Sequence, residues 1–358
     1  MKKTKNKLPR SILLTGAAGF IGSNTLKYLF DKYPDYHFTV LDALTYSGDI
    51  KNIPDYIHKS RNFKFIYGDV RNQKMVDDLV REVDTVVHFA AETHIPRSIN
   101  SDSIFFETDV LGTHRIASAV VNNREKIKRL IHISTSEVYG TAMEKKMDEN
   151  HSLNPQSPYA AAKLGADRLV YSYMITHKIP AVIVRPFNMY GPNQHLEKLI
   201  PRFITSLILE EPMTVHGTGE SSRDFTHVDD LVAALDLIIH AKSGEVDGEV
   251  FNVGSGRDYS VNDIARLVVK LMRSNGMIDK ITHTSYALNI GDRPGQVFRH
   301  NADTSKLRKK LGWKPKVDFE SGLKKTIDWY VNNKEWWSSK IWMRHVPIET
   351  ENKKVEMH

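Results

Sequence analysis

Cysteine is absent from the 358 residues of this sequence. Disulfide bonds and thiolate metal sites are therefore excluded, a reducing compartment fits, and we expect no metal site. Long apolar runs are absent too. None approaches the roughly 20 residues that span a bilayer, so we expect no membrane partner. The basic N-terminus leads directly into a short apolar stretch and a glycine turn, which indicates a strand and not a signal peptide. We therefore expect a cytoplasmic protein.

Neither composition nor charge is extreme. Hydrophobic residues make up 41% of the chain and charged residues 26%, which allows a sizeable core and argues against global disorder. The formal net charge of +7 could attract nucleic acid, but no arginine-rich or aromatic-interleaved stripe stands out. We expect no nucleic-acid partner, and we interpret the excess as solvated lysines together with residues that attract a diphosphate.

The first half of the chain alternates short β-branched runs with segments of helical spacing, such as 20–32 and 113–122. Near-continuous apolar strands separated by helices predict an α/β fold of the Rossmann type, with a doubly wound parallel sheet covered on both faces. Strands are expected at residues 11–15, 38–41, 63–67, 85–90, 130–135 and 181–185.

The rhythm changes after Pro186, where turn-rich pieces separate the helical stretches 199–209, 228–240, 261–273 and 319–332. We predict a dinucleotide-binding domain over residues 8–187, with returning segments near 226–252 and 296–312. A smaller α/β lobe, mainly residues 188–345, is expected to bind the substrate. The polar residues 346–358 are expected to form a flexible tail.

The first expected strand leads into a turn, TGAAGFIG at residues 15–22, that opens a helix. Its three glycines permit a tight turn, close approach of a pyrophosphate and close packing of helix on strand, while the helix N-terminus attracts phosphate. Asp42 follows twenty residues after Gly22, where a carboxylate binds the adenosine ribose and repels a 2′-phosphate. The pattern favours NAD over NADP; simple turn chemistry and a strand-end cap are the alternatives. The candidate contacts are Gly16, Gly19, Phe20, Ile21, Gly22 and Asp42.

Two further strand ends fit a dinucleotide crevice. Asp69 and Val70 follow one strand, where an acid could meet the adenine amino group. The small residues Ala90 and Ala91 follow another and would let the cofactor pass. Each pattern is weak by itself, since an acid after a strand is often only a helix cap.

Tyr159 and Lys163 are four residues apart, so they share one face of a helix. A nearby ammonium stabilises a phenolate and lowers the pKa of the tyrosine, which could then act as a base near neutrality. The alternative interpretation is a surface pair. With the glycine turn upstream, we favour a catalytic pair that also contacts the cofactor.

A second polar group ends the expected strand at 130–135. Ligands of open α/β sheets lie beyond the carboxyl ends of the strands, so Thr135, Ser136 and Glu137 would face the reacting molecule. Thr135 could bind a sugar hydroxyl, and Glu137 could take a proton from carbon. Local capping by the hydroxyls and a surface carboxylate are the alternatives.

These motifs resemble the extended short-chain dehydrogenase/reductase superfamily over residues 11–337. Within it the chain is most similar to the nucleoside-diphosphate-hexose 4,6-dehydratases, in particular the dTDP-glucose type. The motifs that carry the resemblance are LTYSG at 44–48, AAETHIPRSI at 90–99, ETDVLGT at 107–113, NMYGP at 188–192, EKLIP at 197–201, RDF at 223–225 and DRPG at 292–295.

The resemblance implies a reaction cycle. Tyr159, helped by Lys163 and Thr135, removes the proton of the sugar 4-hydroxyl while C4 gives hydride to NAD⁺. Glu137 then removes the C5 proton, water leaves from C6, and the hydride returns to C6. The product is a 4-keto-6-deoxy sugar nucleotide, and NAD stays bound because redox is neutral overall.

The resemblance also implies binding contacts and a homodimer formed through paired helices. Thr93 and Thr108 join the cofactor contacts, and Thr93 also touches substrate. The arginines suit a diphosphate, because planar guanidinium forks match phosphate oxygens. The alternative for each arginine is a surface ion pair. The implied substrate contacts are Thr93, Asn188, Lys198, Leu199, Arg223, Asn252 and Arg293.

Ser136 departs from the dTDP-glucose type, which has an aspartate there that protonates the departing hydroxyl. The acid therefore remains open between Ser136 and Glu137, and so do the nucleotide base and the hexose. A nucleotide-sugar 4-epimerase, a UDP-glucuronate decarboxylase and a non-catalytic NAD-binding protein are the alternative functions. Glu137 argues against the epimerase, and Tyr159 with Lys163 argues against a silent protein.

Overall fold

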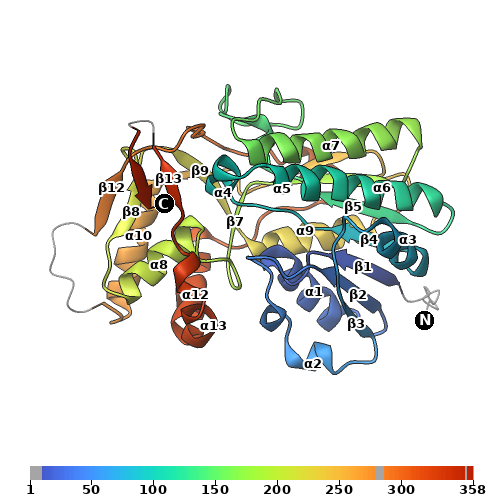
Figure 1. Cartoon of the computed structure of the whole chain (residues 1–358), viewed down its shortest axis with the longest axis horizontal. Coiled ribbons are helices and arrows are strands. Elements are labelled where there is room, and N and C mark those ends of the chain that lie inside the picture. The colour runs from blue at the N-terminus through green and yellow to red at the C-terminus, as the bar shows by residue number, and fades with distance from the viewer. Residues whose placement is uncertain (1–9, 279–285, 351–352, 358) are drawn as a thin grey trace.

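The computed structural model describes residues 10–278, 286–350 and 353–357. A large α/β body lies beside a smaller lobe that carries the C-terminal strands (Figure 1). Residues 8 and 9 of the predicted first domain lie outside the described residues, as do 351, 352 and 358 of the predicted tail.

A seven-stranded sheet forms the centre of the larger body. Its strands are β1 Ser11–Thr15, β2 His37–Asp42, β3 Phe63–Tyr67, β4 Thr85–His88, β5 Arg129–Ile133, β6 Ala181–Pro186 and β10 Val250–Val253. They are ordered β10-β6-β5-β4-β1-β2-β3, and every neighbouring pair is parallel. The predicted doubly wound parallel sheet is confirmed.

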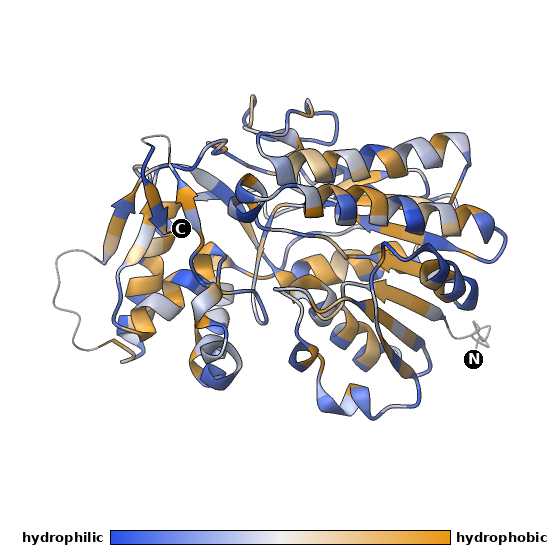
Figure 2. Cartoon of the chain, in the orientation of Figure 1, coloured by the Kyte–Doolittle hydropathy of each residue, from blue (hydrophilic) through white to orange (hydrophobic). Residues whose placement is uncertain are grey.

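Helices cover both faces of this sheet, namely α1 Phe20–Lys32, α3 Gln73–Glu82, α6 Thr113–Asn122, α7 Pro158–Thr176 and α9 Val228–His240. Alternate side chains of a strand point to opposite faces, so one strand serves two cores. Ile12 and Leu14 of β1 pack with α1 and α9, whereas Leu13 packs with α3, α6 and α7. Figure 2 shows hydrophobic strands at the centre and hydrophilic residues on the outer faces of the helices.

Two strands end earlier than predicted. β4 ends at His88 and β5 at Ile133, whereas the apolar and β-branched residues after them had extended the prediction to 90 and 135. The chain turns out of the sheet at both places. Thr135 caps the short helix η3 (Ser136–Tyr139), its Oγ1 accepting from the Glu137 amide at 3.2 Å. These early turns bring polar side chains to one edge of the sheet.

Short helices lie in the connection between β2 and β3 and in the connection between β4 and α6. The segment before α6 is a continuous helical run that includes a π-helical stretch, η2, so its last turns are wider than an α-helix. The short helices are η1 Ile50–Asn52, α2 Asp55–His58, α4 Ile95–Asn100, α5 Ser103–Phe105 and η2 Phe106–Gly112.

The smaller lobe combines two small sheets with helices. One sheet has the order β11-β9-β7 and the other pairs β12 with β8. Phe203, Val268, Leu323 and Trp337 lie in its separate apolar core. Its elements are β7 Asn188–Tyr190, α8 Leu199–Ile208, β8 Met213–His216, β9 Ser222–His227, β11 Asp258–Ser260, α10 Val261–Ser274, β12 Ala287–Ile290, α12 Phe319–Asn332, α13 Lys334–Ser338 and η4 Ile341–Met343.

Later segments of the chain return to the larger body. β10 pairs with β6 at the sheet edge, and α9 packs on α1. Leu307 of α11 (Ser305–Leu311) also belongs to the apolar cluster that contains Ile12. The chain therefore passes between the two bodies several times, which fixes the lobe against the carboxyl edge of the sheet.

The described part of the predicted flexible tail forms a hairpin instead. β13 (Pro347–Glu349) and β14 (Val355–Met357) pair in antiparallel fashion. Ile348 is buried, the Pro347 carbonyl accepts from Asn100 Nδ2 at 2.8 Å, and Glu356 Oε2 accepts from the Gly291 amide at 2.5 Å. The polar composition hid this structure because few side chains of the hairpin are buried, Ile348 and Thr350 among them, and two hydrogen bonds complete its attachment.

Candidate active site

A cavity of about 750 Å³ lies at the carboxyl edge of the large sheet, where the smaller lobe meets it. Residues after β1, β2, β4, β5 and β6 line one side of it, and residues of α8, β9 and the loop after β12 line the other. Open parallel sheets bind ligands at this edge. The cavity is therefore where the predicted site residues were expected to meet.

The cavity wall contains every residue that the sequence assigned to the site, with one exception. The turn after β1 supplies Gly16, Gly19, Phe20, Ile21 and Gly22, and the residues at and after the ends of β2, β3 and β4 are Asp42, Asp69, Val70, Ala90, Ala91 and Thr93. The remaining wall residues of the set are Thr108, Thr135, Ser136, Glu137, Tyr159, Lys163, Asn188, Lys198, Leu199, Arg223 and Arg293.

Asn252 is the exception, and the predicted contact with the diphosphate is wrong. It lies on β10 with no exposed surface, and its side chain is used inside the protein. Its Oδ1 accepts from the Tyr139 hydroxyl at 2.8 Å, and its Nδ2 donates to the Met147 carbonyl at 3.0 Å. In this case a polar residue at a strand end forms hydrogen bonds inside the protein and does not line the cavity.

The glycine turn after β1 has the shape of a phosphate-binding cradle. Gly16 has a φ of +72°, and a Cβ there would lie 2.6 Å from Ala90 Cα. A Cβ on Gly22 would lie 2.5 Å from Ala17 Cα, so this glycine lets the helix pack on the turn. A Cβ on Gly19 would meet only the Gly16 carbonyl, at 3.2 Å, and Gly19 caps α1 without a side-chain bond. The start of α1 thus faces the cavity with uncapped amides, which fits the diphosphate of a dinucleotide.

The two acids expected to read the adenosine differ in their surroundings. Asp42 accepts from the amides of Ala18 and Leu44, both at 2.8 Å, and burial raises the pKa of its carboxyl despite those bonds. Each of its oxygens keeps a lone pair. Asp69 Oδ2 instead accepts from Arg71 Nε and Nη2, at 2.9 and 2.7 Å, so much of its capacity is already used.

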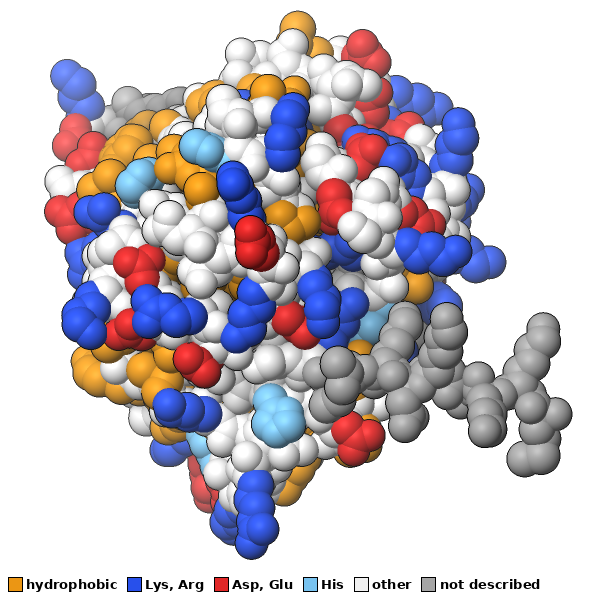
Figure 3. All heavy atoms as spheres, turned by 90° about the vertical axis from the view of Figure 1, so that its right-hand side faces the viewer, with side chains coloured by type: hydrophobic (Ala, Val, Ile, Leu, Met, Phe, Trp, Pro, Cys, Tyr) orange, Lys and Arg blue, Asp and Glu red, His pale blue; other side chains and the backbone are white. Residues whose placement is uncertain are grey.

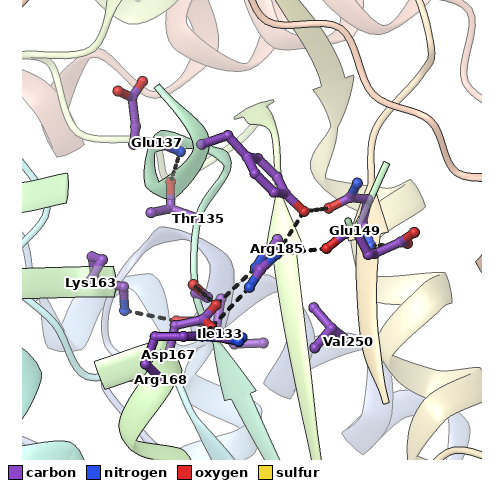
Figure 4. A network of polar contacts seen from close by, with 12 residues as sticks. Ile133, Thr135, Glu137, Glu149, Lys163, Asp167, Arg168, Arg185 and Val250 are labelled. Atoms are coloured by element: carbon purple, nitrogen blue, oxygen red, sulfur yellow. Dashed lines mark hydrogen bonds and ion pairs between the residues drawn. The ribbon is translucent and has the colours of Figure 1, made fainter. Parts of the chain in front are cut away.

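Tyr159 and Lys163 lie on the first turns of α7. The helix begins there because Ser157 caps it, accepting from the Ala160 amide at 3.2 Å, and Pro158 takes the first helical position. Lys163 Nζ donates to the Ile133 carbonyl at 2.8 Å (Figure 4). Burial lowers the pKa of Lys163.

The pKa of Tyr159 is raised, whereas the sequence predicted that it would be lowered. Burial is the largest cause and the carboxylate of Asp109 adds to it, while a hydrogen bond with Thr135 acts in the opposite direction. The four-residue spacing in the sequence had predicted only one charged neighbour for the phenol, the ammonium group of Lys163. The fold adds a desolvated environment and a second titratable group, the fully buried Asp109 on η2, whose own pKa is raised by burial.

Glu137 is a largely buried carboxylate whose pKa is nevertheless lowered. Burial alone would raise it, but the positive charges of His300, Arg223, Arg293 and Lys198 outweigh that effect. His300 is itself neutral near pH 7, since burial lowers its pKa to about 4, so the arginines and the lysine supply the lowering there. Glu137 is therefore ionised at neutral pH and able to accept a proton.

Four cations surround the far side of the cavity. Arg223 Nη2 donates to the Val297 carbonyl at 2.6 Å, Arg293 Nε to Gln296 at 2.6 Å, and Lys198 Nζ to the Thr93 carbonyl at 2.7 Å. Burial, followed by neighbouring arginines, lowers the pKa of Arg202 to about 10. Within the described ranges, no ion pair joins Arg202, Arg223 or Arg293 to a carboxylate. Buried charges bonded only to neutral acceptors suit an anionic ligand.

Sequence reasoning assigned no site role to several residues at or near this cavity, among them Asp109, Arg202 and His300. Asp109 Oδ1 accepts from the Glu92 amide at 2.8 Å, and Arg202 lines the wall on α8. His300 Nδ1 lies 3.2 Å from Ser136 Oγ. None of the three lies within a recognisable spacing from its partner, so only the folded chain brings them together.

A buried polar network supports the site from behind (Figure 4). Asp167 of α7 binds Arg185 of β6 through two bonds, at 2.9 and 3.0 Å, and accepts from Ser134 Oγ at 2.7 Å. Arg185 Nη1 in turn donates to the Tyr139 hydroxyl at 2.9 Å. The network ties α7 to β5 and β6, the two strands that lead to the polar edge.

Comparison with known proteins agrees with this site. The family model described as GDP-mannose 4,6 dehydratase matches residues 13–326. The chain belongs to this dehydratase family. A dTDP-glucose 4,6-dehydratase from Streptomyces niveus is 40% identical over 330 residues, which cover 91% of this chain and 94% of that protein. The resemblance inferred from the motifs is thereby confirmed.

Other members of the family extend the comparison. A trifunctional UDP-glucose 4,6-dehydratase/UDP-4-keto-6-deoxy-D-glucose 3,5-epimerase/UDP-4-keto-L-rhamnose-reductase from Arabidopsis thaliana is 40% identical over 334 residues, 92% of this chain and 48% of that protein. The chain thus spans about half the length of such plant relatives. The structure of a dTDP-glucose 4,6-dehydratase from Streptomyces venezuelae with NAD bound has a TM-score of 0.85 and 34% identity, and covers 92% of this chain and 99% of that one.

The described part of the chain contains no candidate metal cluster and no candidate membrane-spanning helix. No group of three or more His, Asp or Glu side chains in it could hold a metal ion. No helix in the same part of the chain is long and apolar enough to cross a membrane.

Proposed function

We propose that the protein is an NAD-dependent hydro-lyase that converts a nucleoside-diphosphate hexose of the dTDP- or UDP-glucose type to its 4-keto-6-deoxy form. The observation that carries the proposal is that Glu137 lines the same cavity as Tyr159 and Lys163, opposite a group of buried cations. Oxidation at C4 needs only the tyrosine and lysine, whereas loss of water also needs a base for the C5 proton.

The glycine turn and the start of α1 fit the diphosphate of NAD, and Asp42 fits its adenosine ribose. NAD, when bound, supplies the hydride acceptor for C4 and the hydride donor for C6. Thr93, Thr108, Ala90 and Val70 lie along the same wall and are proposed as further contacts. Because Asp42 is buried and the nearest bonds to it come from amides, a 2′-phosphate would meet an uncompensated negative charge there.

Tyr159 is proposed to remove the proton of the sugar 4-hydroxyl. Thr135 lines the cavity wall with Tyr159 and acts to lower the pKa of the phenol, so it can share the same hydroxyl of the sugar. Lys163, held by the Ile133 carbonyl, places a positive charge beside the developing phenolate. Removal of this proton and departure of the C4 hydride give a 4-ketone, which acidifies the hydrogen on C5.

Glu137 is proposed to take that C5 proton. Its lowered pKa keeps it in the carboxylate form at neutral pH, and the burial of most of its side chain limits access of bulk water. Asn188, Lys198 and Leu199 would hold the sugar and nucleotide, while Arg223 and Arg293 bind the diphosphate with charge-assisted bonds.

The proposed enzyme acts as a homodimer in the cytoplasm. Large apolar side chains are exposed on two neighbouring helical segments, Phe106 and Leu111 on η2, and Tyr171 and Ile175 on α7. Covering such side chains is a common reason for association. Light scattering of the purified protein tests the dimer, and a Leu111→Glu variant should shift it toward monomer.

A substrate panel tests the reaction itself. Purified protein is incubated with dTDP-glucose, UDP-glucose, UDP-N-acetylglucosamine, UDP-glucuronate and GDP-mannose, and the products are read by mass spectrometry. We expect loss of one water from a single substrate without added reductant. Loss of carbon dioxide would make the protein a decarboxylase, and isomerisation without a mass change would make it an epimerase. No change with any substrate would refute the proposed function.

A further inference from the structure

His300 lies directly behind the polar edge of the cavity. It is fully buried, and it follows Arg299, which forms an isolated bridge with Ser222 of β9. Both ring nitrogens have partners: Nδ1 lies 3.2 Å from Ser136 Oγ, and Nε2 lies 2.9 Å from the Gly140 carbonyl oxygen. The imidazole therefore joins the two ends of the η3 turn that carries Glu137.

The two partners of the ring decide where its proton lies. A carbonyl oxygen only accepts hydrogen bonds, so Nε2 must carry the hydrogen in the bond to Gly140. Burial lowers the pKa of His300 to about 4, so the ring is neutral near pH 7 and Nδ1 has a bare lone pair. Ser136 is then the donor, and its hydroxyl hydrogen points at His300 and not into the cavity.

The charged and titratable groups around the ring agree with a neutral form. Arg223 and His151 disfavour a positive charge on His300, whereas Glu137, whose Oε1 lies 4.0 Å from Nδ1, favours it. The edge of the Phe187 ring packs against the imidazole. Burial together with Arg223 outweighs the single carboxylate.

The direction of the Ser136 bond divides the chemical roles at this edge. With its hydrogen given to His300, Ser136 Oγ offers only lone pairs to the cavity and can accept a bond from a substrate hydroxyl. It has no free proton to give to a departing group. Glu137, the adjacent carboxyl group, becomes able to give one only after it has received the C5 proton.

We propose that His300 is a positioning residue that takes the Ser136 hydrogen, so that Ser136 holds the sugar 6-hydroxyl as a hydrogen-bond acceptor only. The inference rests on the proposed dehydration. In that step the C5–H bond breaks and its electron pair forms the C5–C6 double bond as the C6–O bond breaks. The proton received by Glu137 passes to the departing hydroxide, which gives water and restores the carboxylate.

Ser136→Ala and His300→Leu test this assignment, with His300→Asn as the matched control because its Oδ1 lies where Nδ1 was. Loss of the Ser136 bond should slow water release about 10- to 100-fold through misplacement of the 6-hydroxyl. Exchange of the C5 hydrogen with D₂O, which needs Glu137 only as a base, should stay within about threefold of the wild type. His300→Asn should keep near-normal water release. The double variant, Ser136→Ala with His300→Leu, should be no slower than the slower of its two single variants.

Two kinetic results would overturn the proposal. Equal loss of C5 exchange and water release in His300→Leu would indicate a merely structural role. Normal water release in Ser136→Ala beside slow release in His300→Leu would show that His300 does not act through Ser136. Wild-type protein that releases no water from any sugar nucleotide refutes the proposed function instead.

Nitrogen NMR of histidine-labelled protein gives a readout that does not depend on turnover. The His300 signals are assigned by their absence from His300→Asn. We expect a neutral ring with hydrogen on Nε2 at neutral pH, and a shift of the Nδ1 signal in Ser136→Ala. Hydrogen on Nδ1, or a charged ring at neutral pH, would overturn the assignment of donor and acceptor whatever the activity.

Discussion

Glu137 combines burial with a lowered pKa, a combination that requires positive charge nearby. The charges come from the smaller lobe, through Arg223, Arg293 and Lys198, while Glu137 itself follows a strand of the larger body. The proposed base is therefore ionised by residues that also suit the substrate diphosphate. Binding of that diphosphate would partly neutralise the arginines and raise the basicity of Glu137 when substrate is present.

Replacement of Glu137 by Gln separates the two chemical stages. Because the amide cannot take the C5 proton, we expect water release to fall about 10²- to 10⁴-fold while oxidation at C4 continues. Absorbance of the reduced nicotinamide should therefore accumulate on mixing with substrate, which mass spectrometry would find undehydrated. The exposed Glu144→Gln serves as control. Water release at the normal rate in Glu137→Gln would exclude this residue as the base.

Tyr159→Phe should abolish the earlier stage, so that no reduced nicotinamide forms. For the wild type, the raised pKa of Tyr159 sets the sign of a pH dependence. A base acts in its deprotonated form, so a raised pKa leaves little phenolate at neutral pH and the rate of C4 oxidation should rise with pH. Stopped-flow absorbance measures it. A rate that falls as pH increases would contradict the assignment of Tyr159 as base.

The position of a single residue could be predicted from the sequence where one short pattern contains everything that places it in the site. The spacing of Tyr159 and Lys163, the glycine turn and the strand-end position of Glu137 are such patterns. His300 and Arg202 could not be found this way, because their partners lie in distant parts of the chain. Asn252 was misassigned for the same reason, since its partner Tyr139 is supplied by another strand connection. The proposed roles of the remaining residues stay predictions.

At the scale of elements, two glycines of the turn after β1, Gly16 and Gly19, differ in the space that they leave for a side chain. Gly16→Ala would force a Cβ to 2.6 Å from Ala90 Cα at a φ of +72°, so it should destabilise the fold. Gly19→Ala meets only one carbonyl at 3.2 Å and should fold, but its methyl group would face the phosphates. We expect its NAD affinity to weaken at least about tenfold, measured by calorimetry. Unchanged affinity in Gly19→Ala would show that the turn does not hold the cofactor.

The bond between α7 and β6 should matter for stability. Asp167→Asn leaves the buried Arg185 without its carboxylate, and breaking such a pair costs about 3 to 5 kcal/mol in the free energy of unfolding. Asp78→Asn, in an exposed pair with Lys74, should leave the free energy of unfolding nearly unchanged, because solvent screens that pair. Urea unfolding gives both values. Similar small losses in the two variants would argue against the network as a support of the site.

The same pair predicts a pH dependence of stability. Bonds from Arg185, with smaller effects of Arg168 and Ser134, overcome burial and lower the pKa of Asp167 to about 2. Its pKa in the unfolded chain is about 3.9. The stabilisation is thus complete above that value and is lost as pH falls toward 2. The difference in unfolding free energy between wild type and Asp167→Asn should shrink over this range.

Element bounds followed the sequence closely where periodicity was long. Helices α1, α6, α9 and α12 have the expected bounds. Apolar spacing marks all four, and side-chain caps mark the starts of α9 and α12, whereas α6 continues the helical run of η2. The ends of β4 and β5 were wrong by two residues each, since hydrophobic or β-branched residues continue past the last ladder bond. These residues leave the sheet and line the cavity instead.

At the scale of the whole molecule, the two bodies divide binding between them. The glycine turn belongs to the larger body, and Arg223 and Arg293 belong to the smaller lobe. Basic and acidic side chains are interspersed on the face of the larger body shown in Figure 3. Arg202, Arg223 and Arg293, which have no carboxylate partner among the described residues, lie instead at the wall of the cavity. Charge is therefore concentrated where a diphosphate would be enclosed.

The C-terminal hairpin contacts both sides of the substrate half of the cavity. β13 packs on α4, whose Arg97 lines the wall, and Glu356 of β14 binds the Gly291 amide two residues before Arg293. Composition alone could not reveal this, because the hairpin is polar and its bonding partners, Asn100 and Gly291, lie far away in the sequence. The predicted domain boundaries near 187 and 345 stay predictions, although the hairpin ties the last segment to both bodies.

A chain that ends at Val346 tests the contribution of the hairpin. Without it, α4 and the loop at 291–295 lose the bonds to Pro347 and Glu356 and the packing of Ile348. We expect the KM for the sugar nucleotide to rise about tenfold, because Arg293 is no longer held in place, with kcat less affected. NAD affinity should not change, since the glycine turn lies in the larger body. Glu356→Gln, which weakens only the contact with Gly291, should produce a smaller rise in KM. Parallel loss of NAD affinity in the truncated chain would mean that the hairpin stabilises the whole fold and does not order the substrate side specifically.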